Sequence, residues 1–311
     1  MKKMMVSLAK SRSRFLILLL IIELIILTVL NPSFMNLKNL VEILQFGATL
    51  FLLAIGESLV ILCIPGGIDI SIGSIVSLSC VTLGFMYRAT GSMLLSIIVT
   101  IAAGAAMGMI NGILCGIFNM PSLIATLGTQ YVYASLALYI TNGVAISGFP
   151  ENFQWLSLKQ TFGIPNQILF VVLPVVILML FIVYRTKFGR ELYLTGDNAL
   201  AARFAAIHTK RVILFVFILA GMLSAIGAII NCSWLMTARA DAGSGMEMNA
   251  ITVAMLGGIN AVAGGRGHLS GVIVGTIISV CSTKPLPKSR TTLDTRGERL
   301  RCFEFDEMDG I

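Results

Sequence analysis

The sequence predicts an all-α polytopic membrane protein with about nine transmembrane helices and a cytoplasmic N-terminus. Of its 311 residues, 57% are hydrophobic and only 12% are charged, and the mean hydropathy is +0.92. Soluble proteins usually carry about a quarter charged residues. Apolar runs of about 20 residues recur along the chain, and this is the length that crosses about 30 Å of hydrocarbon.

Nine helices are expected in chain order. They cover residues 15–30, 44–64, 68–88, 93–116, 122–142, 166–184, 212–235, 249–263 and 269–281. The first run follows basic residues, but the segment after it lacks the small-residue cleavage pattern of a signal peptide. We therefore expect an uncleaved first helix and one transmembrane domain over residues 1–281.

Basic residues predict how these helices are oriented, because short cytoplasmic loops of membrane proteins are rich in lysine and arginine. One cluster precedes the first helix and another follows the sixth, so both can face the cytoplasm. The loops expected outside, 31–43 and 143–165, hold one lysine each. The net charge of +7 therefore indicates topology, and no nucleic-acid partner is expected. The clusters are Lys2, Lys3, Lys10, Arg12 and Arg14, and then Arg185, Lys187, Arg190, Arg203, Lys210 and Arg211.

The stretch PGGIDISIGS, residues 65–74, places helix breakers and a carboxylate in an apolar region. Gly66, Gly67 and Gly73 permit irregular backbone, which is tolerated at membrane depth only where it lines a cavity or is buried in protein. Intramembrane carboxylates are costly and often functional. Asp69 is thus a candidate for the transport pathway, or alternatively the N-cap of the third helix. Glu57 is a second pathway candidate.

A similar break occurs near the end of the chain. The segment GGIN, Gly257 to Asn260, resembles GGID, Gly66 to Asp69, and both follow a hydrophobic run. Transporters commonly place glycine-interrupted helices at corresponding positions of two related halves. Gly257, Gly258 and Asn260 are therefore further pathway candidates.

The helix expected over 93–116 has a glycine face. Gly104, Gly108, Gly112 and Gly116 recur every four residues, and such a face lets two helix backbones approach closely in lipid. We expect this face to pack against another helix. Asn111 lies beside it and either contacts solute or bonds to a neighbouring helix.

The longest polar segment between helices spans residues 185–211. Within it, residues 199–207 favour a short helix, and Asp197 or Asn198 is a plausible N-cap after Gly196. This segment is either a docking element for a cytoplasmic partner or an ordinary basic connector.

No enzymatic motif is found in the sequence. It contains no Gly-Lys dipeptide and hence no Walker loop, and it has no H-E-x-x-H or G-x-S-x-G motif. The six cysteines show no C-x-x-C pair. We expect no catalytic residues, no metal site and no cofactor.

Four blocks in order resemble the permease subunits of bacterial ABC importers for monosaccharides of the ribose, xylose and galactose type, whose relatives also import autoinducer-2. The blocks are GGIDISIGS (66–74), NGILCGIFNMPSLIATLGT (111–129), FGRELYLTGDNALAARFAAI (188–207) and GSGMEMNAITVAMLGGINAVAGGRG (243–267). The resemblance implies a multi-pass protein of the bacterial inner membrane. It also implies three kinds of partner: two cytoplasmic ABC ATPase subunits, an extracytoplasmic solute-binding protein and a second permease copy, as a homodimer or a heterodimer.

The resemblance also assigns the ATPase coupling segment. Its residues are Gly196, Asp197, Asn198, Ala201, Ala202 and Arg203. Ala206 stands where the family usually has glycine. Family members usually have about ten helices, whereas residues 282–311 here form a polar tail, which we interpret as truncated or frameshifted in preference to regulatory. Two other functions stay open, a proton-coupled secondary transporter that uses Glu57 and Asp69, and an inactive truncated permease.

Overall fold

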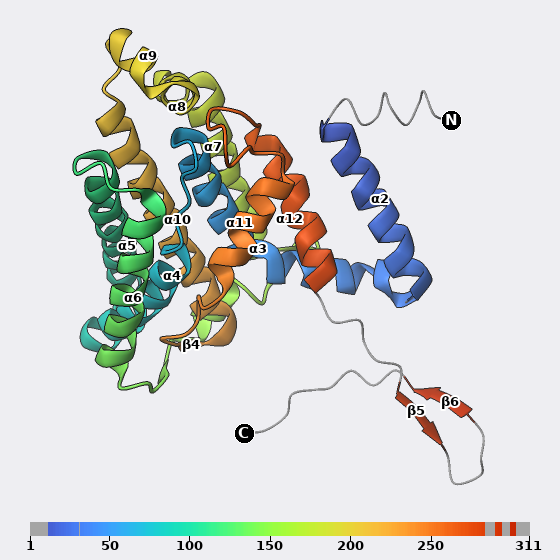
Figure 1. Cartoon of the computed structure of the whole chain (residues 1–311). Coiled ribbons are helices and arrows are strands. Elements are labelled where there is room, and N and C mark those ends of the chain that lie inside the picture. Colours follow the sequence, from blue (N-terminus) through green and yellow to red (C-terminus); the bar gives the residue numbers. More distant parts are fainter. Residues whose placement is uncertain (1–11, 31, 284–289, 294–298, 303–311) are drawn as a thin grey trace, which may run out of the picture.

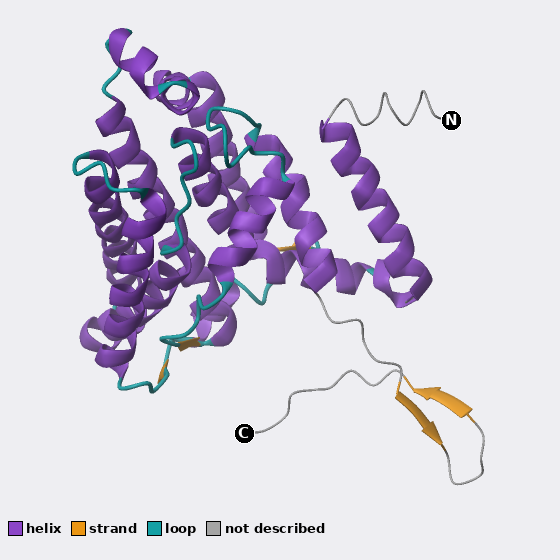
Figure 2. Ribbon diagram, viewed as in Figure 1, coloured by secondary structure: helices purple, strands orange, loops and turns teal. Residues whose placement is uncertain are grey.

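Helices make up most of the described chain, and loops with a few short strands connect them (Figures 1 and 2). The structure is a computed structural model and describes residues 12–30, 32–283, 290–293 and 299–302. Six helical spans among these residues are long and apolar enough to cross a membrane, and three shorter apolar helices accompany them, Leu16–Leu30, Met246–Leu256 and Leu269–Ser282. This is the all-α polytopic architecture that the sequence predicts.

The elements follow in chain order. The first half comprises α2 (Arg12–Leu30), η1 (Pro32–Met35), α3 (Leu37–Cys63), α4 (Ile72–Thr90), α5 (Met93–Gly116), α6 (Ser122–Thr141), β1 (Ile146–Ser147) and η2 (Glu151–Trp155). The second half comprises β2 (Gln160–Thr161), β3 (Ile164–Pro165), η3 (Ile168–Val172), α7 (Leu173–Arg185), α8 (Lys187–Asp197), α9 (Ala199–Phe204), α10 (Thr209–Leu235), β4 (Thr237–Ala238), α11 (Met246–Leu256), α12 (Leu269–Thr283), β5 (Arg290–Leu293) and β6 (Arg299–Cys302).

Helix α3 is the centre of the bundle. It packs against α10, α11, α12 and α8, and side chains such as Leu52, Leu59 and Leu62 are completely buried. A helix that is apolar on all sides is expected in such a position. The helices α5, α6 and α7 instead keep many large apolar side chains exposed, as helices that meet lipid or a partner subunit do.

The glycine face of α5 packs against α10 along its length. A Cβ atom added to Gly108 would fall against the carbonyl group of Phe217, and one on Gly104 would meet Ala225 and Gly221. Gly112 and Gly116 face the same helix near Leu214 and Ile213, respectively. The two backbones therefore touch, which is the close approach that small residues permit in a membrane.

The two ends of the bundle differ in structure. Helices α8 and α9 lie at one end, and β4 lies at the other (Figure 1). At the β4 end lie the antiparallel pairs β1–β4 and β2–β3. Two hydrogen bonds join α10 to the segment between α6 and η3, one donated by Ser157 to α10 and one donated by Ser233 of α10 to that segment. The basic residues around α8 identify its end as the cytoplasmic one.

Several helix boundaries differ from the expected ones. The third helix begins at Ile72 instead of residue 68, and α11 ends at Leu256 instead of residue 263. In both places the glycines account for the difference, since Gly66 and Gly258 have positive φ angles of 71° and 93° that interrupt a right-handed helix. The cytoplasmic segment holds two helices, α8 and α9, where one over 199–207 was expected.

The predicted polar tail lies mostly outside the described residues. Within 282–311 the structure describes the last residues of α12 and the antiparallel pair β5–β6. The interpretation of residues 282–311 as a truncated or frameshifted ending stays a prediction.

Candidate functional site

The first helix break spans residues 64–71 and turns back into the protein. Helix α3 ends at Cys63 near α8, and α4 starts at Ile72. Gly66 is exposed, whereas Asp69 is completely buried. The break therefore carries irregular backbone from the cytoplasmic end of the bundle into its interior, and this backbone is buried in protein, as the bilayer requires.

Every backbone N–H from Gly66 to Ser71 has an acceptor, although the segment is not helical. In chain order the acceptors are Ala261 O, Ile64 O, Ser122 Oγ, Glu57 Oε1, Thr126 Oγ1 and Asp69 Oδ1, at 2.8 to 3.2 Å. Two of these acceptors, Ser122 and Thr126, are one helical turn apart on α6. A buried N–H without a partner would cost about 1–3 kcal/mol, so α6 stabilises the break.

A buried polar network surrounds Asp69. Its Oδ1 accepts hydrogen bonds from the backbone N–H (2.9 Å) and the hydroxyl (2.6 Å) of Ser71. Asn111 donates from Nδ2 to the same hydroxyl (2.7 Å), so it contacts a neighbouring segment of the protein. Glu57, also completely buried, accepts from the backbone of Asp69. Glu57 Oε2, Asp69 Oδ2 and Asn111 Oδ1 find no partner among the described residues.

Asp69 is not the N-cap of α4, which corrects one of the two predicted roles. The N-cap residue is Ser71, whose side chain makes no capping bond. Asp69 instead forms an Asx turn, in which its side-chain oxygen accepts from the backbone N–H two residues later, just before the helix begins. Because Asp69 is completely buried, it does not line an open path in this structure.

Gly73 lies in the first turn of α4, where no side chain fits. A Cβ atom there would collide with the Glu247 carboxylate and the Gly243 carbonyl group. Gly243 in turn donates its N–H to Ser77 on α4 (3.0 Å). The segment before α11 is therefore held directly against α4, so that the N-terminal part of α11 and the end of the first break are neighbours.

The second break, between α11 and α12, has the same internal turn as the first. Asn260 Oδ1 accepts from the backbone N–H of Val262 (3.0 Å), two residues ahead, as Asp69 Oδ1 does from Ser71. Gly257 cannot carry a side chain because it packs on the α12 backbone at Val272, and Gly258 has a positive φ. The fourth residue of GGID and of GGIN thus performs one role, the closing of a turn.

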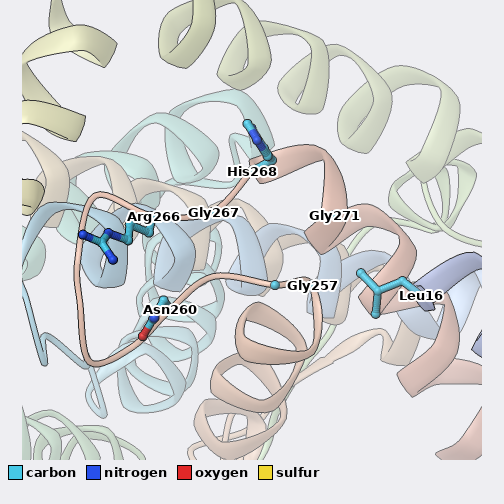
Figure 3. Close-up of a pocket in the computed structure, with 8 residues that line it drawn as sticks. Leu16, Gly257, Asn260, Arg266, Gly267, His268 and Gly271 are labelled. Atoms are coloured by element: carbon cyan, nitrogen blue, oxygen red, sulfur yellow. The ribbon is translucent and has the colours of Figure 1, made fainter. Parts of the chain in front are cut away.

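The two breaks lie side by side. Gly66 donates to Ala261 O (2.8 Å), and Gly265 donates to Leu62 O (2.8 Å). A small cavity of about 270 Å³ adjoins the second break. Figure 3 shows Asn260, Arg266 and His268 around it, with Leu16 of α2 on the far side. The structure therefore brings together the residues of both predicted breaks.

Through Gly196 the predicted coupling segment packs on the end of α3, just before the first break, and on the second break. A Cβ atom there would strike Leu62 O and Gly265 N. Tyr193 donates its hydroxyl to Gly267 O (3.1 Å), and burial raises the pKa of Tyr193, which keeps this group a neutral donor. Asp197 lies 3.9 Å from Arg266 in an exposed ion pair. The end of α8 is therefore attached to the loop 257–268.

Helix α9 is a short exposed element capped by Asn198. Its Oδ1 accepts from the N–H groups of Leu200 and Ala201 (3.1 and 3.0 Å), while Ala202 is buried. Arg203 donates from Nε to Thr209 Oγ1 (3.2 Å). Ala206, which stands where glycine was expected, has a φ of 59°, and this left-handed conformation explains the family's preference for glycine.

Sequence reasoning missed several residues of this region. Ser122 and Thr126 stabilise the first break, and Glu247 packs beside Gly73. Leu200 and Phe204 are 64% and 86% exposed at the cytoplasmic end. Only Ser122 and Thr126 carried a usable signal, since hydroxyl residues spaced by four after a proline lie on one helix face.

Comparisons with known proteins agree with this architecture. Residues 39–286 match a family described as the permease component of branched-chain amino acid transport systems. The chain is 35% identical over 253 residues to the autoinducer 2 import system permease protein LsrC of Yersinia enterocolitica, covering 81% of this chain and 69% of that protein. It is 30% identical over 263 residues to the ribose import permease protein RbsC of Escherichia coli K12, covering 83% and 81%. No solved structure matches the chain.

Proposed function

The chain belongs to the family of permease components of branched-chain amino acid transport systems, and from this membership we propose that it is the membrane subunit of an ATP-driven importer for a monosaccharide or similar small polar solute. The similarity to permeases named for ribose and autoinducer 2 import supports this substrate class. The chain is a multi-pass membrane protein, and we expect it in the bacterial inner membrane.

The ATP-hydrolysing motor would be a separate cytoplasmic ABC subunit. The supporting observation is α9, which presents Leu200 and Phe204 to the cytoplasm, 64% and 86% exposed, outside the six spans that are long enough to cross the membrane. Large exposed apolar side chains at such a place are typical of a docking surface. The residues proposed to couple ATPase and permease are Gly196, Asp197, Asn198, Ala201, Ala202 and Arg203.

Coupling would reach the membrane interior through the glycine contacts at the end of α8. Gly196 touches Leu62 and Gly265, which belong to the regions of the first and second breaks. A rigid movement of α8 and α9 would therefore displace both breaks together. Alternating access needs such a connection between the motor and the pathway, and we propose that Gly66, Gly67, Asp69, Gly73, Glu57, Asn111, Gly257, Gly258 and Asn260 form or position that pathway.

Two further partners complete the proposal. A second permease copy, identical or related, would pair with this chain in the bilayer, and an extracytoplasmic solute-binding protein would deliver the solute at the β4 end. The many exposed apolar side chains of α5, α6 and α7 provide surface for both lipid and a second copy.

A proton-coupled transporter is the competing function, with Glu57 and Asp69 as proton carriers. Both carboxylates are completely buried, and each holds a hydrogen bond to the break itself. Proton carriers must meet water on at least one side in some state. The observed geometry therefore favours a structural role in shaping the break.

The test is transport by the reconstituted complex. The full chain would be co-expressed with an ABC ATPase and a solute-binding protein chosen from its genomic neighbourhood, and uptake of radiolabelled D-ribose, D-xylose and D-galactose into proteoliposomes would be measured. We expect uptake of one of these sugars that requires ATP on the ATPase side and is unaffected by a protonophore. Uptake that continues without ATP and stops with the protonophore would establish the proton-coupled alternative.

A further inference from the structure

A second cavity lies in the extracytoplasmic half of the bundle, away from the helix breaks. It has a volume of about 160 Å³ and is lined by α3, α10, α11 and the residue before η3. On α10 its residues belong to the last two turns, at the end opposite to α9. We call it the amide cavity, after the side chains of Gln45, Gln167, Asn231 and Asn249 that line it together with Thr49 and Trp234.

The deep wall of the amide cavity holds unpaired polar groups. Gln167 and Asn231 are only 1% and 8% exposed, and Gln167 Oε1 and Asn231 Oδ1 have no hydrogen-bond partner among the described residues. Leaving a buried polar atom unpaired costs about 1–3 kcal/mol. Native interiors therefore rarely keep two such groups beside a cavity unless a ligand or water bonds to them.

Of these two side chains, Gln167 is held in place by its neighbours. Gln167 donates from Nε2 to Gln45 O (2.8 Å), and Gln45 donates from its own Nε2 to Ser157 O (3.1 Å). Thr49 bonds to Gly227 O on α10 (3.3 Å). With its nitrogen held, the amide of Gln167 presents its oxygen in a fixed orientation, and such preorganisation reduces the entropy lost when a ligand binds.

The rim of the amide cavity is aromatic. Phe46 and Trp234 meet edge to face, with ring centroids 6.0 Å apart and planes at 82°, and they are 50% and 37% exposed. An indole ring offers a large apolar face beside a polar N–H donor. A sugar ring has the complementary character, with hydroxyl groups around its edge and C–H groups on its faces.

The chemistry of the lining indicates a neutral ligand. Among the described residues that line the amide cavity, none is charged, whereas carboxylates and phosphates are usually bound by arginine or lysine. A few oriented polar groups in a largely apolar pocket are typical of small-molecule sites. Fixed amides, a hydroxyl and an aromatic rim together suit a small polyhydroxylated molecule.

We propose that the amide cavity is a subsite for a neutral monosaccharide at the extracytoplasmic end of the permease. The proposal rests on the proposed function and adds to it a place where the solute would bind. Asn231 and Gln167 would accept hydrogen bonds from sugar hydroxyl groups, Asn249 would bond at the rim, and Trp234 would pack on the ring.

The chain contains its own reporter for this site. It has two tryptophans, and Trp155 stacks on Phe170 outside the cavity (5.4 Å). In the full-length Trp155→Phe variant, Trp234 is the single fluorophore. Its emission would be followed in purified protein titrated with D-ribose, D-xylose and D-galactose, and with D-ribose 5-phosphate as the charged comparison.

We expect a saturable change with at least one neutral sugar and none with the phosphate. Asn231→Leu and Gln167→Leu should each raise the half-saturating concentration about tenfold or more, because each removes a buried oxygen that would accept from a sugar hydroxyl group. Asn249→Leu, at an exposed position where substitutions usually change stability little, should also weaken binding. Ser224→Ala is the matched control and should leave the half-saturating concentration unchanged, because this hydroxyl on the same helix bonds, among the described residues, only to Ala220 O (2.9 Å).

Three outcomes would overturn the subsite. The first is no fluorescence response to any of the three sugars, and the second is an equal response to D-ribose 5-phosphate. The third is an unchanged sugar affinity in all three amide variants when thermal unfolding shows that these variants are folded. The importer itself is tested separately by ATP-dependent uptake. Uptake without sugar binding in the amide cavity would overturn only the subsite, and binding without ATP-dependent uptake would overturn only the importer.

Discussion

The backbone N–H of Gly66 lies 2.8 Å from the carbonyl oxygen of Ala261, so a hydrogen bond joins the two helix breaks. Both breaks contain a GGI sequence followed by an acidic residue or its amide, and in both this fourth residue accepts a bond from the N–H two positions ahead. Aspartate and asparagine are equivalent for this purpose, since each offers an oxygen at the same distance from the backbone.

Asp69→Asn should therefore preserve the fold and transport. The amide keeps an oxygen for Ser71 and leaves no ionisable group at this position beside Glu57. Asp69→Leu should lower the free energy of unfolding by about 1–3 kcal/mol, because it leaves the N–H of Ser71 unpaired. Thermal unfolding in detergent and ATP-dependent uptake would measure both effects. Loss of transport in Asp69→Asn, with folding intact, would instead support proton coupling.

The glycine face of α5 makes a second prediction. Gly108→Ala should lower the free energy of unfolding by about 1–3 kcal/mol, the usual cost of overpacking, because the new Cβ would fall against the Phe217 carbonyl group. Thermal unfolding of the purified variants would show this.

Gly128→Ala on α6 is the matched control for Gly108→Ala. Both glycines lie within apolar spans, but nothing lies within 4 Å of a Cβ added to Gly128. Alanine there should raise helix stability by up to about 1 kcal/mol. Equal effects of the two substitutions would contradict a packing role for the α5 face.

A third prediction concerns the hydroxyl groups that α6 offers to the first break. Thr126→Val removes the acceptor for the N–H of Ile70 while keeping the side chain's shape. We expect faster hydrogen exchange across residues 64–71, followed by mass spectrometry. Thr129→Val is the control, because Thr129 bonds only to Thr126 O on its own helix (3.1 Å). If the two variants exchange alike, α6 does not stabilise the break.

The breaks illustrate what could be predicted from the sequence. Glycine, proline and a carboxylate in apolar sequence signal irregular backbone by their own conformational limits, so GGID and GGIN were identified without a structure. Their similarity indicated corresponding positions in two related halves, but it did not predict the contact through Gly66 and Ala261. The glycine spacing on α5 likewise predicted a close helix neighbour but not which helix, because many α-helices could supply the facing surface.

Other features depend on tertiary structure alone. The spacing of Ser122 and Thr126 places them on one helix face, but only the tertiary structure shows that this face meets the first break. The amide cavity draws Gln45, Gln167 and Asn231 from three separate segments. Isolated amides in apolar sequence have no period or spacing that would relate them, so their convergence could not be predicted.

The exposed side chains of α9 make the last prediction. Phe204 is 86% exposed at the cytoplasmic end of the bundle, and if it docks into an ATPase subunit, Phe204→Ala should weaken that contact by about 2 kcal/mol or more, as truncation of a buried aromatic anchor does. Co-purification of the ATPase with the tagged permease, and uptake, should both fall. The control is Phe215→Ala on α10, because Phe215 is also exposed (53%) but lies within a membrane span. An ATPase that co-purifies equally with both variants would place its docking surface elsewhere than on α9.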